Sequence, residues 1–195
     1  MNLALFLLLN AGQHASGMAI GAARFLAQDL VWMVPAGLSV GWLRASSATR
    51  QVLIVAAVAG LAGLLINQTI GLVWYHPRPF EAGIGRTLIP HAQDSSFPSD
   101  HLTLIWAVAF SLLSHRQTRF AGWALALMGL PVAWARIYLG VHFPLDILGA
   151  ALVALLIARL VLWQERRLIA PLMRLLLPLH QLIFAGLIRK GWVAK

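Results

Sequence analysis

The sequence contains no cysteine, so neither disulfide bonds nor thiolate chemistry is available to the protein. Charged side chains are also scarce, at 11% of the 195 residues, whereas 60% are hydrophobic. A soluble domain cannot bury that much apolar surface, and the mean hydropathy of +0.79 indicates a membrane protein. The length suits one helical bundle, and we expect residues 1–195 to form a single membrane-embedded domain.

A continuous basic run is also missing. The net charge is +9, but the basic residues lie at the ends of hydrophobic segments. We therefore expect no nucleic-acid partner, and we attribute the charge to membrane topology and contact with anionic lipid. The first ten residues lack the basic region and cleavage site of a removed signal peptide. Their apolar run is shorter than the roughly 20 residues that span a bilayer, so a short interfacial or re-entrant helix is expected.

Long apolar stretches predict an all-α fold, a polytopic bundle of transmembrane helices. The expected spans are residues 23–43, 51–74, 102–114, 121–137 and 145–163. A sixth stretch, 168–188, is long enough to span, but it carries Arg174, His180 and Gln181 and is interrupted by Pro178. That stretch could cross the membrane or lie along its surface.

Arginines orient the predicted bundle. They flank three connections on one side, at Arg44, Arg50, Arg116, Arg119, Arg166 and Arg167. By the positive-inside rule this side is cytoplasmic. The only long polar connection, 75–98, and the turn around 138–142 then lie on the opposite side. Loops of this length are usually functional or disordered, and the apolar and aromatic content of 75–98 argues against disorder.

His142 and Asp146 are the first candidates for chemistry on that side. Pro144 fits the first turn of a helix, which places His142 just outside the helix and Asp146 within its first turn. Four residues apart, the carboxylate can reach one imidazole nitrogen, fix the tautomer and leave the other nitrogen as a nucleophile. Taken alone, however, the pair is better explained by a capping Asp beside a loop His.

Two arginines become candidate phosphate ligands when they are considered together with His142 and Asp146. Arg136 precedes His142 by six positions, at the end of a hydrophobic segment, where it would otherwise be an ordinary interface residue. Beside a nucleophile it becomes a bidentate phosphate ligand. Arg78 is held between Pro77 and Pro79, which leave its backbone little entropy to lose. A rigid turn at the membrane interface would explain the prolines but not the arginine.

The segment Pro98-Ser99-Asp100-His101 is typical of a helix start. Ser99 is a natural N-cap, and Asp100 falls in the first turn. The free backbone N–H groups of such a turn bind phosphate oxygens, and His101 then lies within reach of a leaving-group oxygen. An ordinary capped helix explains Ser99 and Asp100 well and His101 poorly.

Together these segments resemble the type-2 phosphatidic acid phosphatase superfamily. Its first motif ends in Arg-Pro, as in Arg78-Pro79, and its second is Pro-Ser-Gly-His, similar to residues 98–101. Its third is Ser-Arg, five residues, His, three residues and Asp, similar to residues 135–146. The runs 75–80 and 94–101 and the Leu5-Phe6…Asn10 start resemble, within it, the bacitracin-resistance type of undecaprenyl-diphosphate phosphatase. This resemblance extends to about residue 150.

The resemblance implies an integral-membrane enzyme that hydrolyses undecaprenyl diphosphate to undecaprenyl phosphate and phosphate. Such an enzyme recycles the lipid carrier of peptidoglycan synthesis and confers bacitracin resistance. The resemblance further implies the bacterial inner membrane, with the active site facing the periplasm or cell exterior. His142 would form a phosphohistidine, Asp146 would orient it, and His101 would be the general acid. The phosphate would be surrounded by Arg78, Arg136 and Ser99.

Three positions depart from the superfamily motifs. Gly71 stands where the first motif begins with Lys, so another group must neutralise one phosphate oxygen. Asn67, one helical turn earlier, and His91 are candidate substitutes. Asp100 replaces Gly, either repelling the substrate phosphate or raising the proton affinity of His101. Ala135 replaces Ser.

Other interpretations stay open on the sequence alone. The same site could serve phosphatidic acid, phosphatidylglycerophosphate or a lipid A phosphate. A bacitracin-export permease subunit is compatible with the hydrophobic segments but would need an ATPase partner, because the chain has no P-loop. The interpretation as a haloperoxidase is the weakest, because those soluble proteins would not need this hydrophobicity. No cofactor is expected, and no obligatory metal either, because Asp94 and Asp100 are separated by a proline turn.

Overall fold

A computed structural model describes all residues 1–195, and its only regular structure is helical, as the sequence predicts. Before the first long helix come α1 (Asn2–Leu9), α2 (Gly17–Arg24), the π turn η1 (Phe25–Asp29), the 3-10 turn η2 (Leu30–Trp32) and α3 (Met33–Arg44). The remaining helices are α4 (Ser47–Val73), α5 (Asp100–Leu113), α6 (Arg119–Tyr138), α7 (Pro144–Trp163), α8 (Glu165–Ile183) and α9 (Ala185–Arg189).

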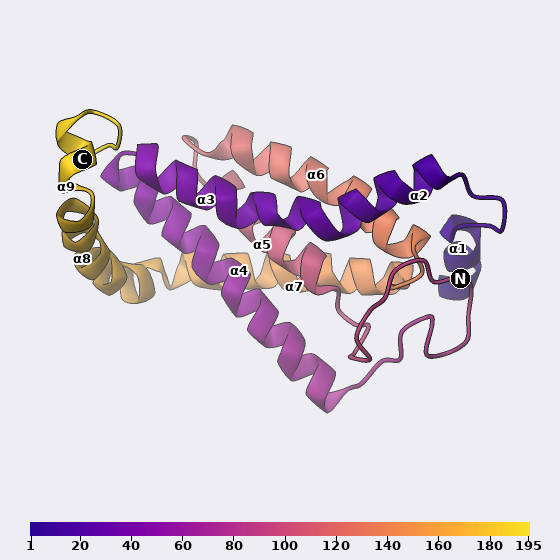
Figure 1. Ribbon diagram of the computed structural model, residues 1–195. Coiled ribbons are helices and arrows are strands. Elements are labelled where there is room, and N and C mark those ends of the chain that lie inside the picture. Colours follow the sequence, from indigo (N-terminus) through magenta and orange to yellow (C-terminus); the bar gives the residue numbers. More distant parts are fainter.

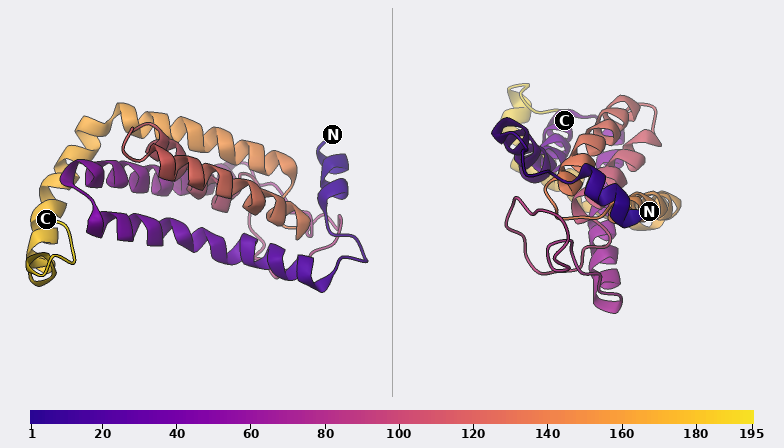
Figure 2. Two further views of the ribbon diagram at one scale, coloured as in Figure 1. Left: turned by 90° about the horizontal axis from the view of Figure 1, so that it is seen from above. Right: turned by 90° about the vertical axis from the view of Figure 1, so that its right-hand side faces the viewer.

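The bundle is built around α5. This helix packs against α4, α6 and α7 and buries Leu102, Ile105 and Val108 among them (Figures 1 and 2). Three helices, α4, α6 and α7, are long and apolar enough to cross a membrane, while α5 is apolar but shorter. Their outer surfaces expose large apolar side chains such as Leu65 and Leu148, which water would not favour. The molecule is therefore a membrane protein.

The predicted spans 51–74, 102–114, 121–137 and 145–163 coincide closely with α4, α5, α6 and α7. The predicted span 23–43 is different, because that part of the chain is a broken helix in which η1 and η2 separate α2 from α3. Pro35 lies in the first turn of α3. Since proline has no N–H to donate to Val31, a continuous α-helix through this point would lose a hydrogen bond.

The sixth hydrophobic stretch forms α8 and α9. Helix α8 continues through Pro171 and Pro178, turns away from α7, and crosses the end of the bundle (Figures 1 and 2). The C-terminal segment is fastened there by Arg50, whose Nε donates to Trp42 O at 2.9 Å and whose Nη2 donates to Ala194 O at 2.7 Å. Arg50 is fully buried, so this arginine is a structural residue and does not face lipid headgroups.

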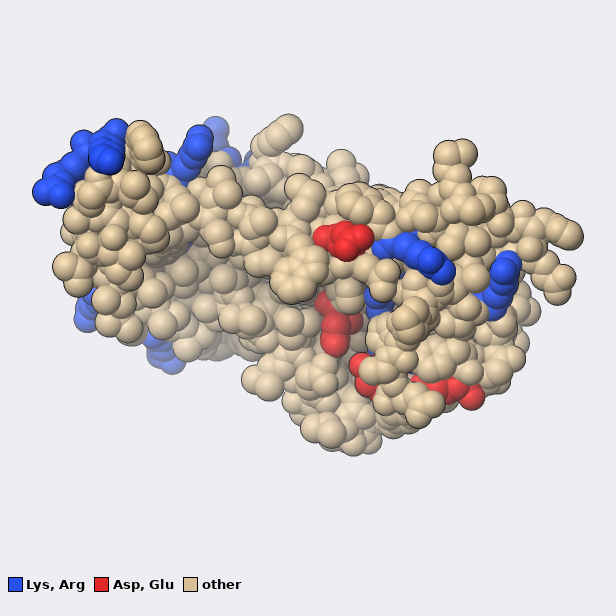
Figure 3. Space-filling view, in the orientation of Figure 1, with Lys and Arg blue, Asp and Glu red and all other residues tan.

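The opposite end of the bundle holds α1 and the long connection 74–99, which contains no helix or strand. Phe6 of α1 packs on Phe143 with ring centroids 5.1 Å apart, and Asn10 accepts from Arg86 N at 2.7 Å. On the face shown in Figure 3, the acidic side chains lie in this half of the molecule, whereas a group of Lys and Arg side chains lies at the α8–α9 end. All three motifs therefore meet at one end of the bundle.

Candidate active site

His142 lies in the turn between α6 and α7 and is 1% exposed. Its Nδ1 is 2.9 Å from Ser96 O, and its Nε2 is 3.2 Å from both Arg78 Nη1 and Arg136 Nη2. A carbonyl can only accept a hydrogen bond, and a guanidinium can only donate one. The proton of the neutral ring is therefore on Nδ1, and the lone pair of Nε2 faces the two arginines.

The turn that presents His142 depends on Gly140. This residue has φ +79°, a conformation that side chains other than glycine rarely adopt. A Cβ at this position would also lie 2.3 Å from Arg86 O. The turn directs Val141 O toward Arg78 Nη1, which donates to it at 2.8 Å. The same local geometry thus places His142 and one of the two arginines that contact it.

Asp146 makes both of the contacts that the sequence left open. Its Oδ2 accepts from Phe143 N at 2.7 Å, which caps the start of α7, and lies 3.4 Å from His142 Nδ1. The nearest acceptor for the imidazole N–H is Ser96 O, so Asp146 would share its predicted orienting role with this backbone carbonyl. The hydroxyl of Ser96 donates to Asp146 Oδ2 at 2.5 Å and so connects the two groups. Sequence reasoning missed Ser96, because a backbone acceptor leaves no side-chain pattern.

The two arginines are held by further contacts. Arg78 Nε donates to Asp94 Oδ1 at 2.8 Å, and Arg136 Nη2 lies 3.0 Å from His91 Nε2. Arg136 Nε has no hydrogen-bond partner although it is buried, and the same is true of Ser99 Oγ. Buried polar atoms are normally paired, so both atoms are available to an anionic ligand.

Ser99 does occupy the N-cap position of α5, but its side chain makes no capping hydrogen bond, contrary to the prediction. The start of α5 is held instead from α4. Asn67 Nδ2 donates to Asp100 Oδ1 at 2.9 Å and to Thr103 Oγ1 at 3.0 Å, and Gln68 Nε2 donates to Asp100 Oδ2 at 3.0 Å. Asn67 therefore supports the helix start through Asp100, and its amide hydrogens are not free to replace the missing Lys.

His91, the other candidate substitute, does lie at the site. Its ring centroid is 6.4 Å from that of His142, and its Nδ1 is 3.1 Å from Ala92 O. Burial is the main cause that lowers the pKa of His91 below its ordinary value of 6.5, and the charge of Arg78 lowers it further. His91 is therefore neutral near pH 7, and it cannot supply the positive charge of a lysine.

Burial also lowers the pKa of His142 well below 6.5, and the nearby Arg136 and Arg78 lower it further. A neutral imidazole, with a lone pair on one ring nitrogen, is the form that attacks phosphorus. His101, the second residue of α5, lines a cavity of about 460 Å³ together with His91, Asp100 and Arg136. The predicted acid His101 and Arg136 thus line one space, and Arg136 in turn contacts His142.

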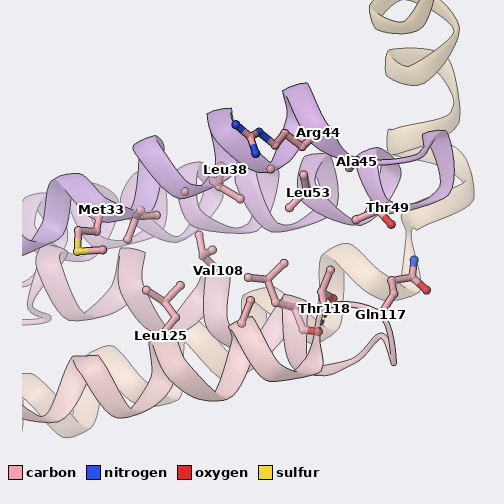
Figure 4. Close-up of a pocket in the computed structure, with 15 residues that line it drawn as sticks. Met33, Leu38, Arg44, Ala45, Thr49, Leu53, Val108, Gln117, Thr118 and Leu125 are labelled. Atoms are coloured by element: carbon pink, nitrogen blue, oxygen red, sulfur yellow. Dashed lines mark hydrogen bonds between the residues drawn. The ribbon is translucent and has the colours of Figure 1, made fainter. Parts of the chain in front are cut away.

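A separate cavity of about 390 Å³ lies between α3–α4 and α5–α6, toward the α8 end (Figure 4). Aliphatic side chains such as Leu38, Leu53, Val108 and Leu125 line it, and Arg44 is its only charged residue. No constellation for phosphate chemistry is present there. No three His, Asp or Glu side chains of the chain come close enough together to hold a metal ion.

Comparison with known proteins agrees with this geometry. Residues 51–170 match the PAP2 superfamily. The chain is 38% identical to YbjG of Escherichia coli (strain K12), covering 99% of this chain and 97% of that protein. It is 34% identical to the undecaprenyl-diphosphatase BcrC of Bacillus subtilis (strain 168), covering 97% of each. The crystal structure of Aquifex aeolicus LpxE shares the fold, with a TM-score of 0.64 and 22% identity over 83% of this chain and 94% of LpxE.

The match covers all three motifs and more than half of the chain. The protein therefore belongs to the PAP2 superfamily, and its relatives include an undecaprenyl-diphosphatase.

Proposed function

We propose that the protein is an integral-membrane phosphatase that hydrolyses undecaprenyl diphosphate to undecaprenyl phosphate and inorganic phosphate. The observation that carries this proposal is the environment of His142, whose Nε2 lone pair lies 3.2 Å from each of two guanidinium groups. Those groups would bind the non-bridging oxygens of a phosphate and bring phosphorus to the nucleophile. The similarity to BcrC supports the diphosphate substrate.

The reaction has two steps. His142 Nε2 attacks the terminal phosphorus while the bond to the bridging oxygen breaks, and the bonding electrons leave with the lipid monophosphate. His101 protonates that oxygen. Water then attacks the phosphohistidine, with His101 accepting its proton, and inorganic phosphate leaves as the N–P bond breaks. Arg78, Arg136 and the start of α5 at Ser99 stabilise the equatorial oxygens.

The membrane arrangement follows from the same proposal. The α2–α3 segment, α4, α5, α6 and α7 form five spans of the bacterial inner membrane, and α1 lies at the interface. The active site faces the periplasm or cell exterior, where it can recycle the lipid carrier and confer bacitracin resistance. Support comes from the arginines that share the opposite end, namely Arg44, Arg116, Arg119, Arg166 and Arg167.

A substrate panel tests the function. Protein purified in detergent, without nucleotide, should release phosphate from undecaprenyl diphosphate faster than from phosphatidic acid, phosphatidylglycerophosphate or a lipid A phosphate. The activity should survive EDTA and be inhibited by vanadate, which mimics five-coordinate phosphorus. Preference for one of the monophosphates would reassign the substrate. Failure to release phosphate from any lipid would instead leave a permease subunit as the better account.

A further inference from the structure

The break between α2 and α3 reaches the active site. In the π turn η1, Ala27 O accepts from Arg136 Nη1 at 3.4 Å. Arg136 also contacts His142, so the π turn is one residue removed from the nucleophile. Single π turns inside helices occur frequently at functional sites. A change in this turn is therefore expected to alter the catalytic cavity through Arg136.

The next residue, Gln28, lines the same cavity as His101 and Arg136. It is exposed, so its carboxamide is accessible to a ligand. A carboxamide presents two N–H donors without a charge. Gln28 is thus a polar side chain on the wall of the cavity that the two-step reaction does not use.

The cavity wall becomes apolar one helical turn beyond Gln28 and His101. Trp32 follows Gln28 by four positions and Leu104 follows His101 by three, while Leu64 lies on α4. Trp32, Leu104 and Leu64 all line the cavity. Because α4 runs opposite to α5 and to the α2–α3 segment, all three apolar residues lie on the side toward the middle of the bundle (Figure 1). A polar tier is therefore followed by an apolar tier, in the order of a phosphate and its hydrocarbon chain.

We propose that Gln28 binds the lipid-side phosphate of a diphosphate substrate and thereby selects polyprenyl diphosphates over lipid monophosphates. This inference rests on the proposed function. In a diphosphate the group leaving toward His101 is itself a phosphate, whose oxygens need donors. In a lipid monophosphate the leaving group is an alcohol without those oxygens. Because Gln28 is neutral, it can recognise the leaving phosphate without holding the charged product as tightly as an arginine would.

The test is the ratio of kcat/KM for a polyprenyl diphosphate to kcat/KM for phosphatidic acid. Gln28→Ala should lower the value for the diphosphate about 10-fold, which is typical for a hydrogen bond to a charged group, and leave phosphatidic acid unchanged. Gln28→Glu should lower it further, because its carboxylate repels the phosphate. Gln117→Glu makes the same change at the other end of the bundle and should alter neither substrate.

Equal losses on both substrates would overturn the inference, because they would mean that Gln28 only supports the π turn. An unchanged ratio in Gln28→Ala and Gln28→Glu would also overturn it. The proposed function fails in a different way, namely if the wild-type protein does not release phosphate from the diphosphate. The thermal stability of each variant, measured in the same detergent, should match that of the wild type.

Discussion

At the scale of single residues, the tautomer of His142 is set by an acceptor on one ring nitrogen and donors on the other. Ser96 O can only accept from His142, while Arg78 and Arg136 can only donate to it. The ring is thereby held in one tautomer before substrate binds. The two arginines also disfavour protonation of the ring, because two cations beside an imidazole destabilise a third positive charge.

The expected pH dependence of activity follows from this lowered proton affinity of His142. Burial first, and then Arg136 and Arg78, lower the pKa of His142, so its neutral form should persist well below pH 6.5. We expect the acid limb of kcat/KM, which reports the free enzyme, to lie below pH 6.5. In Arg136→Gln, the residual activity should show this limb at higher pH, because one cation is gone. A wild-type limb centred at or above pH 6.5 would contradict the assignment of His142.

Gly71 offers a second residue-scale prediction. A Cβ there would lie 3.0 Å from Ser95 Cβ, and Ser95 O accepts from Arg78 Nη2 at 3.3 Å. Gly71→Lys should therefore displace Arg78 and lower activity about 10- to 100-fold, the scale of a misplaced catalytic contact. Gly71→Ala adds the Cβ without an ammonium group, so it separates the effect of crowding from the effect of charge. Kinetics on a diphosphate and a monophosphate lipid would decide, and a selective gain of Gly71→Lys on the monophosphate would contradict this expectation.

Much of the site could be predicted from residue spacing, and its supporting contacts could not. The spacing of Arg136, His142 and Asp146 depends on one turn and one helix start, so local rules suffice. The roles of Ser96 and Asn67 depend on chain segments that meet only after folding. Asn67 was expected near the phosphate because it shares a face with Gly71, yet Asp100 and Thr103 take its amide hydrogens.

At the scale of elements, uniform hydrophobic runs predicted α4, α6 and α7 closely, because such runs have one stable form in a membrane. The α2–α3 break was missed, since a π turn leaves no simple period in the sequence.

Helix α8 differs from all of these. It buries Ile169, Met173 and His180 on one face and exposes Leu168 and Leu175 on another. A third face carries Arg167, Arg174 and Gln181.

We therefore expect α8 to lie in the plane of the cytoplasmic interface, with its exposed leucines in lipid. The chain has no native cysteine, so a single Cys can be labelled specifically. In Leu175→Cys, an environment-sensitive fluorophore in anionic vesicles should report an apolar setting, quenched best by shallow nitroxide lipids. In the adjacent Arg174→Cys it should report water. Strongest quenching of both by a mid-bilayer nitroxide would show that α8 spans the membrane.

At the scale of the whole molecule, the ends of the bundle differ in charge and in chemistry. The three motifs share the end with loop 74–99, and the connection between α5 and α6 lies at the other. Ala82→Cys, beside Gly83, should be labelled by an impermeant reagent from outside the cytoplasm, and Gln117→Cys only from the cytoplasm. Both sites should be assayed in the same cell type. Labelling of Ala82→Cys only from the cytoplasm would invert the orientation and remove access to an outward-facing lipid carrier.

The central claim is that His142 takes the phosphate from a lipid diphosphate, and trapping the intermediate tests it most directly. Purified protein should be mixed with polyprenyl diphosphate labelled at the terminal phosphate, quenched rapidly into base, and digested to find the labelled peptide. We predict acid-labile phosphate on His142. A folded His142→Ala protein should give no label and no turnover. His101→Ala should still form the label, although about 10²- to 10⁴-fold more slowly. Label on another residue, or wild-type turnover by folded His142→Ala, would contradict the account.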